Sequence, residues 1–174
     1  MVMNIRNFSL FTIFIIIFSL TSCGFQTIYY NNSSENNIDY HEKLTLVKIK
    51  KYRSNIHYKL HNHLTKTLNP YNVQNHKEYI LDIQLTDQKS STFTTSTGSS
   101  GRNKITLIAK YKLLDIKSND ILGSGTVSES GDFDVGKKRF ANYITEEETK
   151  LELTKLISID IRNMIINDLY QITQ

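Results

Sequence analysis

The sequence predicts an α+β fold in which two helices pack on one face of a four-stranded, mostly antiparallel sheet. Alternating apolar and polar residues, clearest at 78–85 and 105–113, indicate strands with one buried face. Apolar residues that recur every three or four positions at 54–69 and 140–172 indicate helices with one buried stripe. The expected chain order is strand, helix, three strands and a long helix, which favours two packed layers.

Residues 1–22 have the features of a secretory signal peptide. Arg6 supplies positive charge, and the apolar run from Phe8 to Leu20 falls short of the roughly 20 residues that span a bilayer as a helix. The run ends in Leu20-Thr21-Ser22-Cys23, which resembles the lipobox of bacterial lipoproteins. The resemblance implies that Cys23 is lipidated and becomes the first residue after cleavage. The alternative is an accidental free thiol, because Cys23 is the only cysteine and no intramolecular disulfide can use it.

Residues 23–43 are rich in Asn, Ser and charge and contain no helical or alternating pattern, so we expect a flexible tether after the lipid. Residues 44–174 are expected to form one α+β domain. The formal net charge of +4 and a pI near 9.0 favour acidic partners. In a cell envelope these would be phosphate-bearing lipid headgroups more readily than nucleic acid.

The domain is expected to begin with a strand over Leu44–Lys50, with Thr45, Val47 and Ile49 on one face. Ser54 is a suitable N-cap for the helix that follows. Asn69-Pro70 ends this helix, because proline disfavours helical geometry in the residue before it. Its buried stripe is predicted to contain Ile56, Leu60, Leu64 and Leu68.

His57 and His61 share one face of this helix at a spacing that can bind a metal. A metal-dependent periplasmic hydrolase is therefore one hypothesis. No third ligand is placed by spacing and no Glu follows His57, so a solvated polar face, or one that faces a channel lumen, is the favoured interpretation.

The middle of the chain predicts strands joined by turns. Glu78–Gln84 is a half-buried strand whose inward positions are Tyr79, Leu81, Ile83 and Leu85, and a Ser/Thr/Gly segment over 89–101 reads as a hairpin tip or loop. After the strand Ile105–Leu113, a turn over 117–120 leads back into a strand that carries Gly123 and Gly125. These glycines lack the spacing of a phosphate-binding motif, so they favour a bulge or a close backbone approach.

A polar loop is expected over Gly131–Arg139, followed by the longest element of the chain. Glu146, Glu147 and Glu148 are interpreted as support for the helix dipole. The apolar stripe of this helix is predicted to contain Phe140, Ile144, Leu151, Thr154, Ile157, Ile161, Ile165 and Leu169, and to be widened by Leu153, Met164 and Ile172.

Several features together resemble the LPS-assembly lipoprotein LptE family. They are Cys23-Gly24-Phe25 with Tyr29 close behind, the helix that starts at Ser54, the run Ala109-x-Tyr111-x-Leu113-x-Asp115, and the lead-in Phe133–Ala141 to the last helix. The resemblance implies a non-enzymatic, cofactor-free lipoprotein that plugs an outer-membrane β-barrel and helps it to assemble and to insert lipopolysaccharide. Gly24, where aspartate would resemble an inner-membrane retention signal, favours the outer membrane.

Two basic groups are candidate lipopolysaccharide-binding residues: Arg102 with Lys104, and Lys137 with Lys138 and Arg139. Lys and Arg bind phosphate as point charges or bidentate forks, which suits the phosphates of lipid A. The alternatives are that both groups are merely solvated charge, or that the chain is an envelope lipoprotein that scaffolds another complex.

Overall fold

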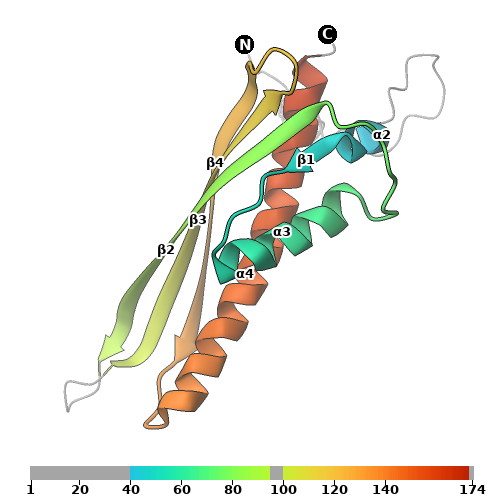
Figure 1. Ribbon diagram of the computed structural model, residues 1–174. Helices are drawn as coiled ribbons and strands as arrows, with labels where there is room; N and C mark the ends of the chain where they lie inside the picture. The colour runs from blue at the N-terminus through green and yellow to red at the C-terminus, as the bar shows by residue number, and fades with distance from the viewer. Residues whose placement is uncertain (1–39, 95–99, 173–174) are drawn as a thin grey trace, which may run out of the picture. The chain divides into compact units, whose positions relative to one another are not determined.

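The described residues of this computed structural model, 40–94 and 100–172, form four strands and three helices (Figure 1). In chain order these are α2 (Tyr40–Thr45), β1 (Val47–Ile49), α3 (Asn55–Leu68), β2 (Tyr79–Thr94), β3 (Ser100–Asp115), β4 (Ile121–Asp134) and α4 (Arg139–Gln171). The predicted α+β class is confirmed, and α2 is an element that the sequence did not indicate.

The strands follow one another across the sheet in the order β1-β2-β3-β4. Strand β1 runs parallel to β2 over three residue pairs, from Val47 opposite Tyr79 to Ile49 opposite Leu81. The pairs β2–β3 and β3–β4 are antiparallel and much longer. Helix α4 packs on β4 and β3, while α3 packs beside α4 and near β1. The sheet is therefore mixed, with β1 as its one parallel strand.

The core lies between the sheet and the two long helices. The predicted inward residues Leu81 and Ile83 of β2 are buried, and so are all five alternating residues of β3 from Ile105 to Leu113. Across from them, α3 buries Leu60, Leu64 and Leu68 and ends at Leu68, with Asn69 as its C-cap before Pro70, as predicted. Helix α4 completes the core with Leu153, Thr154, Ile157, Ser158, Ile161, Ile165 and Leu169.

Gly123 and Gly125 of β4 permit the close approach that the sequence suggested. A Cβ atom on Gly123 would lie 2.1 Å from Oδ2 of Asp168 on α4, and one on Gly125 would lie 2.8 Å from the Tyr111 ring. The Tyr111 hydroxyl donates a 2.8 Å hydrogen bond to the same Asp168 oxygen, and burial raises the pKa of Asp168. The glycines thus accommodate a helix–sheet contact.

The beginning of the domain differs from the prediction of a seven-residue strand. Residues 40–45 are helical, so the strand is limited to Val47–Ile49 and the last four residues of the predicted tether lie in α2. The Thr45 hydroxyl donates a 2.6 Å hydrogen bond to the Glu42 carbonyl oxygen. A helical turn lets the neighbouring residues Leu44 and Thr45 both be buried, whereas a strand would point them to opposite faces. The rest of the predicted tether lies outside the described residues.

Two predicted loops are largely strand. Strand β2 continues to Thr94 and β3 begins at Ser100, so only 95–99 of the Ser/Thr segment fall outside the described residues. Strand β4 likewise extends to Asp134, which shortens the predicted 131–139 loop. Ladder hydrogen bonds and the β-propensity of Thr extend these strands where apolar alternation has ceased.

The predicted stripe of α4 is right from Leu153 to Leu169 and wrong at both ends. Phe140, Ile144 and Leu151 before it and Ile172 after it are exposed. At about 100° per residue, Ile144 and Leu151 fall on the flank of the face that carries Ile157 and Ile161.

Candidate functional site

Both predicted basic groups lie at one end of the sheet, where the β2–β3 hairpin turns and β4 leads into α4 (Figure 1). Arg102 is paired with Asp134 across β3 and β4, and the Val135 amide donates a 3.0 Å hydrogen bond to the Gly101 carbonyl oxygen. The fold thus brings Arg102 and Lys104 near the loop that holds Lys137, although the two groups are more than 30 positions apart in sequence. We call these five residues, Arg102, Lys104, Lys137, Lys138 and Arg139, the basic end.

The loop of the basic end is held by one side chain of α4. The Asn142 Oδ1 atom accepts the Gly136 amide at 2.8 Å, and its Nδ2 group donates to the Gly136 carbonyl oxygen at 2.8 Å. The backbone N–H of Asn142 also donates to the carbonyl oxygen of Lys138, the N-cap residue of α4. The backbone that carries Lys137 and Lys138 is therefore held in place, which would lower the entropy lost if these side chains bound an anion.

Acidic residues neutralise part of this charge. The Arg102 Nε atom lies 2.9 Å from Oδ1 of Asp134, and this hydrogen-bonded pair raises the pKa of Arg102. Lys104 is half-buried opposite Asp132 in the β3–β4 register. Lys137, Lys138 and Arg139 are exposed, so these three contribute most of the accessible positive charge.

Large apolar side chains are exposed close to the basic end in the fold. Phe93 near the hairpin turn is 61% exposed, and Phe140 and Tyr143 in the first turns of α4 are 77% and 58% exposed. Aromatic side chains beside cations suit a ligand with both phosphates and hydrocarbon, because aromatic rings favour the boundary between the two. The sequence prediction assigned Phe140 to the core and missed its exposure.

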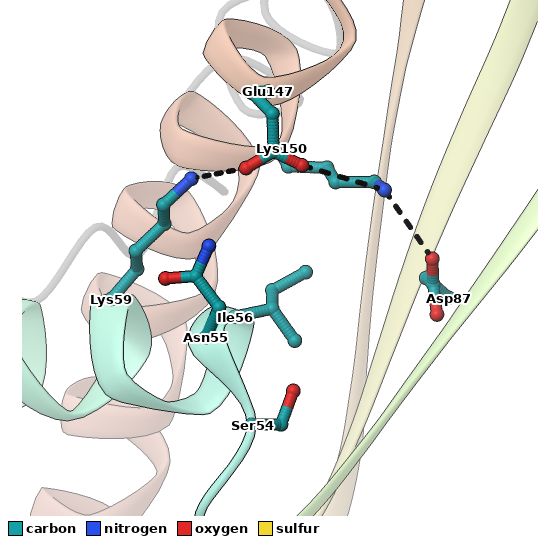
Figure 2. Close-up of a pocket in the computed structure, with 7 residues that line it drawn as sticks. All are labelled: Ser54, Asn55, Ile56, Lys59, Asp87, Glu147 and Lys150. Atoms are coloured by element: carbon teal, nitrogen blue, oxygen red, sulfur yellow. Dashed lines mark hydrogen bonds and ion pairs between the residues drawn. The ribbon is translucent and has the colours of Figure 1, made fainter. Parts of the chain in front are cut away.

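A cavity of about 230 Å³ lies where the N-terminal end of α3 meets β2 and α4 (Figure 2). Lys59 of α3 forms a 2.6 Å ion pair with Glu147 of α4, and Lys150 of α4 lies 3.7 Å from Asp87 of β2. The two lysines therefore face two carboxylates within the cavity. Its lining residues are Ser54, Asn55, Ile56, Lys59, Asp87, Glu147 and Lys150.

The ion pairs of this cavity connect three elements and so have a structural role. Glu146 accepts from Lys150 at 2.8 Å and from Lys89 of β2 at 2.6 Å, and these two hydrogen bonds lower the pKa of Glu146. Charge is balanced throughout, so the cavity offers no net attraction to an anion. Glu146 and Glu147 lie beyond the first turn of α4 and bind lysines of other elements, which the helix-dipole interpretation missed.

His57 and His61 are half-buried and one ring nitrogen of each is buried, so they are less solvated than the predicted polar face. His57 Nε2 accepts the Leu85 amide of β2 at 3.3 Å, just beyond the point where β1 stops pairing with β2. The Nδ1 atoms of both residues are buried, and burial lowers both pKa values. In the described residues, no group of three His, Cys, Asp or Glu side chains could hold a metal ion.

Cys23 and the signal segment lie outside the described residues. Among the helices that the structure describes, none is long and apolar enough to cross a membrane. Membrane attachment through Cys23 therefore stays a prediction from the sequence.

Comparison with known proteins identifies the fold. No protein-family model and no curated protein matches the chain. Among solved structures, a protein described as a lipoprotein from Caulobacter crescentus CB15 aligns with a TM-score of 0.63 and 14% identity, covering 76% of this chain and 96% of that one. The chain has the fold of bacterial lipoproteins.

Two further lipoprotein structures agree with this assignment. Rare lipoprotein B from Shewanella oneidensis aligns with a TM-score of 0.57 and 8% identity, over 74% of this chain and 97% of that one. A minor lipoprotein from Acinetobacter baumannii aligns with a TM-score of 0.51 and 13% identity, over 70% and 89%. The alignments cover nearly the whole of these neighbours, so the similarity extends through the domain.

Proposed function

We propose that this chain is a non-enzymatic lipoprotein, anchored to the outer membrane through Cys23, that plugs a lipopolysaccharide-assembly β-barrel and contacts lipopolysaccharide with its basic end. The observation that carries the proposal is the meeting of Arg102 and Lys104 with Lys137, Lys138 and Arg139 at one end of the sheet, next to exposed aromatic residues. The shared fold of bacterial lipoproteins supports the lipoprotein assignment. The resemblance of the sequence to LptE supports the barrel and lipopolysaccharide partners.

The chemistry of the basic end fits the two parts of lipid A. Lysine and arginine attract its phosphates, while Phe93 and Phe140 offer apolar surface to its acyl chains. The fixed 135–138 loop presents its lysines without a large ordering cost. No redox or metal chemistry is needed for this role.

Charge reversal tests the contact with lipopolysaccharide. In the mature chain carrying Cys23→Ser, Lys137, Lys138 and Arg139 are changed together to Glu, and binding to purified lipopolysaccharide is measured at low and high salt. We expect a large loss of affinity at low salt and a smaller one at high salt, because screening already weakens the attraction there. The stability of the variant should change by no more than about 0.5 kcal/mol per exposed substitution.

The matched control reverses Lys110 and Lys112, which are exposed on β3 away from the basic end. It reverses two charges where the triple variant reverses three, and it should leave binding nearly unaltered. If the triple variant folds and binds with unchanged affinity and salt dependence, Lys137, Lys138 and Arg139 have no part in binding.

The lipid anchor is tested separately. The Cys23→Ala chain should remain an unprocessed precursor that incorporates no labelled palmitate, because acylation requires the thiol. Equal labelling of the Cys23→Ala chain and the unsubstituted chain would exclude Cys23 as the acylated residue.

The second candidate is an envelope lipoprotein that scaffolds a different complex, and the fold comparison favours it equally because several lipoproteins share this architecture. Affinity purification from the native envelope separates the two. Recovery of a large outer-membrane β-barrel protein supports the plug, and recovery of other partners without a barrel supports the scaffold.

A further inference from the structure

Strand β4 is the last strand of the sheet on the side away from β1 (Figure 1). The Val135 amide donates to the Gly101 carbonyl oxygen, and these two residues continue the register of the β3–β4 pairing. Backbone groups alternate sides along an antiparallel strand, so the odd-numbered residues of β4 bond to β3 and the even-numbered residues point away from it. We use the name β4 edge for the outward N–H and C=O groups of Leu122, Ser124, Thr126, Ser128, Ser130 and Asp132.

The β4 edge is accessible to an incoming strand. Five of its six residues are exposed, and Leu122 is half-buried. Within residues 40–94 and 100–172, no other group forms a hydrogen bond to these outward N–H and C=O groups. The edge therefore presents a row of donors and acceptors at the spacing of a strand, which another extended backbone can match along its length.

The opposite edge of the sheet is protected in ways that β4 is not. Strand β1 covers the start of β2, and the His57 ring accepts the Leu85 amide just beyond it. Farther along, β2 carries Lys89 and has an irregular register between Ser91 and Thr94. Short edge strands, lysines and bulges are devices by which proteins prevent a sheet edge from pairing with another chain.

Strand β4 has few of these devices. It is 14 residues long, contains no lysine or proline, and keeps an unbroken register with β3 from Gly123 to Asp134. Before Asp132, its one charged residue is Glu129. The exposed even-numbered side chains before Asp132 belong to Ser and Thr, so pairing at this edge would depend on the main chain more than on apolar burial. A long, regular edge of this kind indicates a surface that can receive a strand.

We propose that the β4 edge binds an extended segment of the barrel protein as a fifth strand of this sheet. The inference rests on the proposed function, which supplies the barrel as the partner, and it states which surface of the domain that partner contacts. Strand addition suits a plug in a polar lumen, because main-chain hydrogen bonds can hold the two proteins together without an apolar patch on either. A second copy could offer its own β4 edge, but a lumen filled by one copy leaves no room for another.

The charges beside the β4 edge restrict the segment that fits. Glu129 and Asp132 lie at neighbouring positions toward the end of the strand, on opposite faces of the sheet. Like charges directly opposite each other destabilise a sheet, whereas opposite charges stabilise it. The bound segment is therefore expected to carry lysine or arginine, and no carboxylate, opposite these two residues.

Proline at edge positions tests the proposal. Thr126→Pro with Ser130→Pro removes two N–H donors of the β4 edge and none that bond to β3, and an edge strand tolerates proline where its N–H faces outward. The matched control, Thr126→Ala with Ser130→Ala, removes the same side chains and keeps both donors. Each full chain is affinity-purified from the native envelope, and the recovered barrel protein is quantified. We expect at least about tenfold less barrel with the proline variant, because two main-chain hydrogen bonds are lost.

Hydrogen exchange gives a second measurement that leaves β4 unchanged. In the free mature chain with Cys23→Ser, the amides of the β4 edge should exchange fast and the odd-numbered amides of β4 slowly, because the odd-numbered amides bond to β3. In the purified complex with the barrel, the amides of the β4 edge should become slow as well. If the proline variant unfolds at a lower temperature than the alanine variant, this measurement decides the question.

The outcomes separate this inference from the proposed function. Recovery of no barrel by the unsubstituted chain would overturn both. Equal recovery by stably folded proline and alanine variants, or β4-edge amides that stay fast in the complex, would overturn the inference alone. Slow exchange of these amides in the free chain would also overturn it. A slow exchange that requires high protein concentration would mean that a second copy covers the edge, and one independent of concentration would mean that another part of this chain does.

Discussion

The inner face of β2 makes apolar contacts along its first half and ion pairs along its second half. From Tyr79 to Leu85, every second residue is apolar and packs in or against the core beneath α3. Beyond the start of α3 at Asn55, the next two positions with the same spacing are Asp87 and Lys89. Asp87 lies 3.7 Å from Lys150 of α4, and Lys89 lies 2.6 Å from Glu146.

The difference shows that one strand can keep its period while the chemistry of its inner face changes. Where α3 covers the strand, burial excludes water and apolar side chains are favoured. Where α3 is absent, water reaches the face and long charged side chains bridge to α4. Lys89 also lies 5.2 Å from the ring centroid of Phe133, so its cation covers the edge of the core.

The largest effect is expected where α4 covers the apolar core. Ile157→Ala and Ile161→Ala should each lower the free energy of unfolding by about 2 to 5 kcal/mol, because both residues are fully buried. Denaturation with urea measures the change. The control is Lys155→Ala, an exposed position on the same helix that should alter stability by no more than about 0.5 kcal/mol. Unchanged unfolding in both Ile variants would mean that this face of α4 meets a partner and not the sheet.

An intermediate effect is expected at Glu146, where the charged half of β2 meets α4. The pKa of Glu146 is lowered by its hydrogen bonds to Lys150 and Lys89, so it stabilises the fold above its unfolded pKa of about 4.3. That stability is lost as the pH falls through the lower pKa of the folded state. Glu146→Gln should therefore be less stable than the parent by about 1 kcal/mol or less at neutral pH, and the difference should shrink as the solution is acidified.

Urea denaturation of both chains over a pH series measures this difference. The control Glu148→Gln removes a neighbouring exposed carboxylate charge and should change stability by no more than about 0.5 kcal/mol. A difference in the free energy of unfolding between Glu146→Gln and the parent that grows on acidification would contradict the assignment of the ion pairs.

The sequence predicted the elements that bury alternating or helical stripes and missed those that do not. Strand β3 and helix α3 were predicted with their buried residues, because one face of each is buried and its apolar residues recur at the period of a strand or a helix. The far half of β2 was assigned to a loop, since its Ser, Thr and charged residues carry no such selection. Its strand conformation depends on pairing with β3, from Asp87 opposite Leu107 to Thr94 opposite Ser100.

The candidate site divides in the same way. Charge composition was enough to select Arg102, Lys104, Lys137, Lys138 and Arg139, but their meeting at one end follows from the β3–β4 register, which the sequence does not state. The exposure of Phe140 was missed because an apolar residue at helical spacing is usually core. The α2 turn was missed because the Leu-Thr-Leu-Val run around it has the composition of a strand.

The smallest effect on stability is expected at the far end of β2, and it gives the sharpest contrast with the near half. Phe93 is 61% exposed, so Phe93→Ser should change the free energy of unfolding by no more than about 0.5 kcal/mol. Ile83→Ser, on the covered half of the same strand, should destabilise by several kcal/mol or more, because it removes buried apolar surface and adds a hydroxyl group.

If Phe93 contacts acyl chains, as the proposed function requires, Phe93→Ser should also weaken binding to lipopolysaccharide by a factor that salt hardly alters, since apolar contact is not screened. A loss that disappears at high salt would assign the effect to the neighbouring charges, and a destabilisation comparable to that of Ile83→Ser would show that the far half of β2 is covered by apolar packing after all.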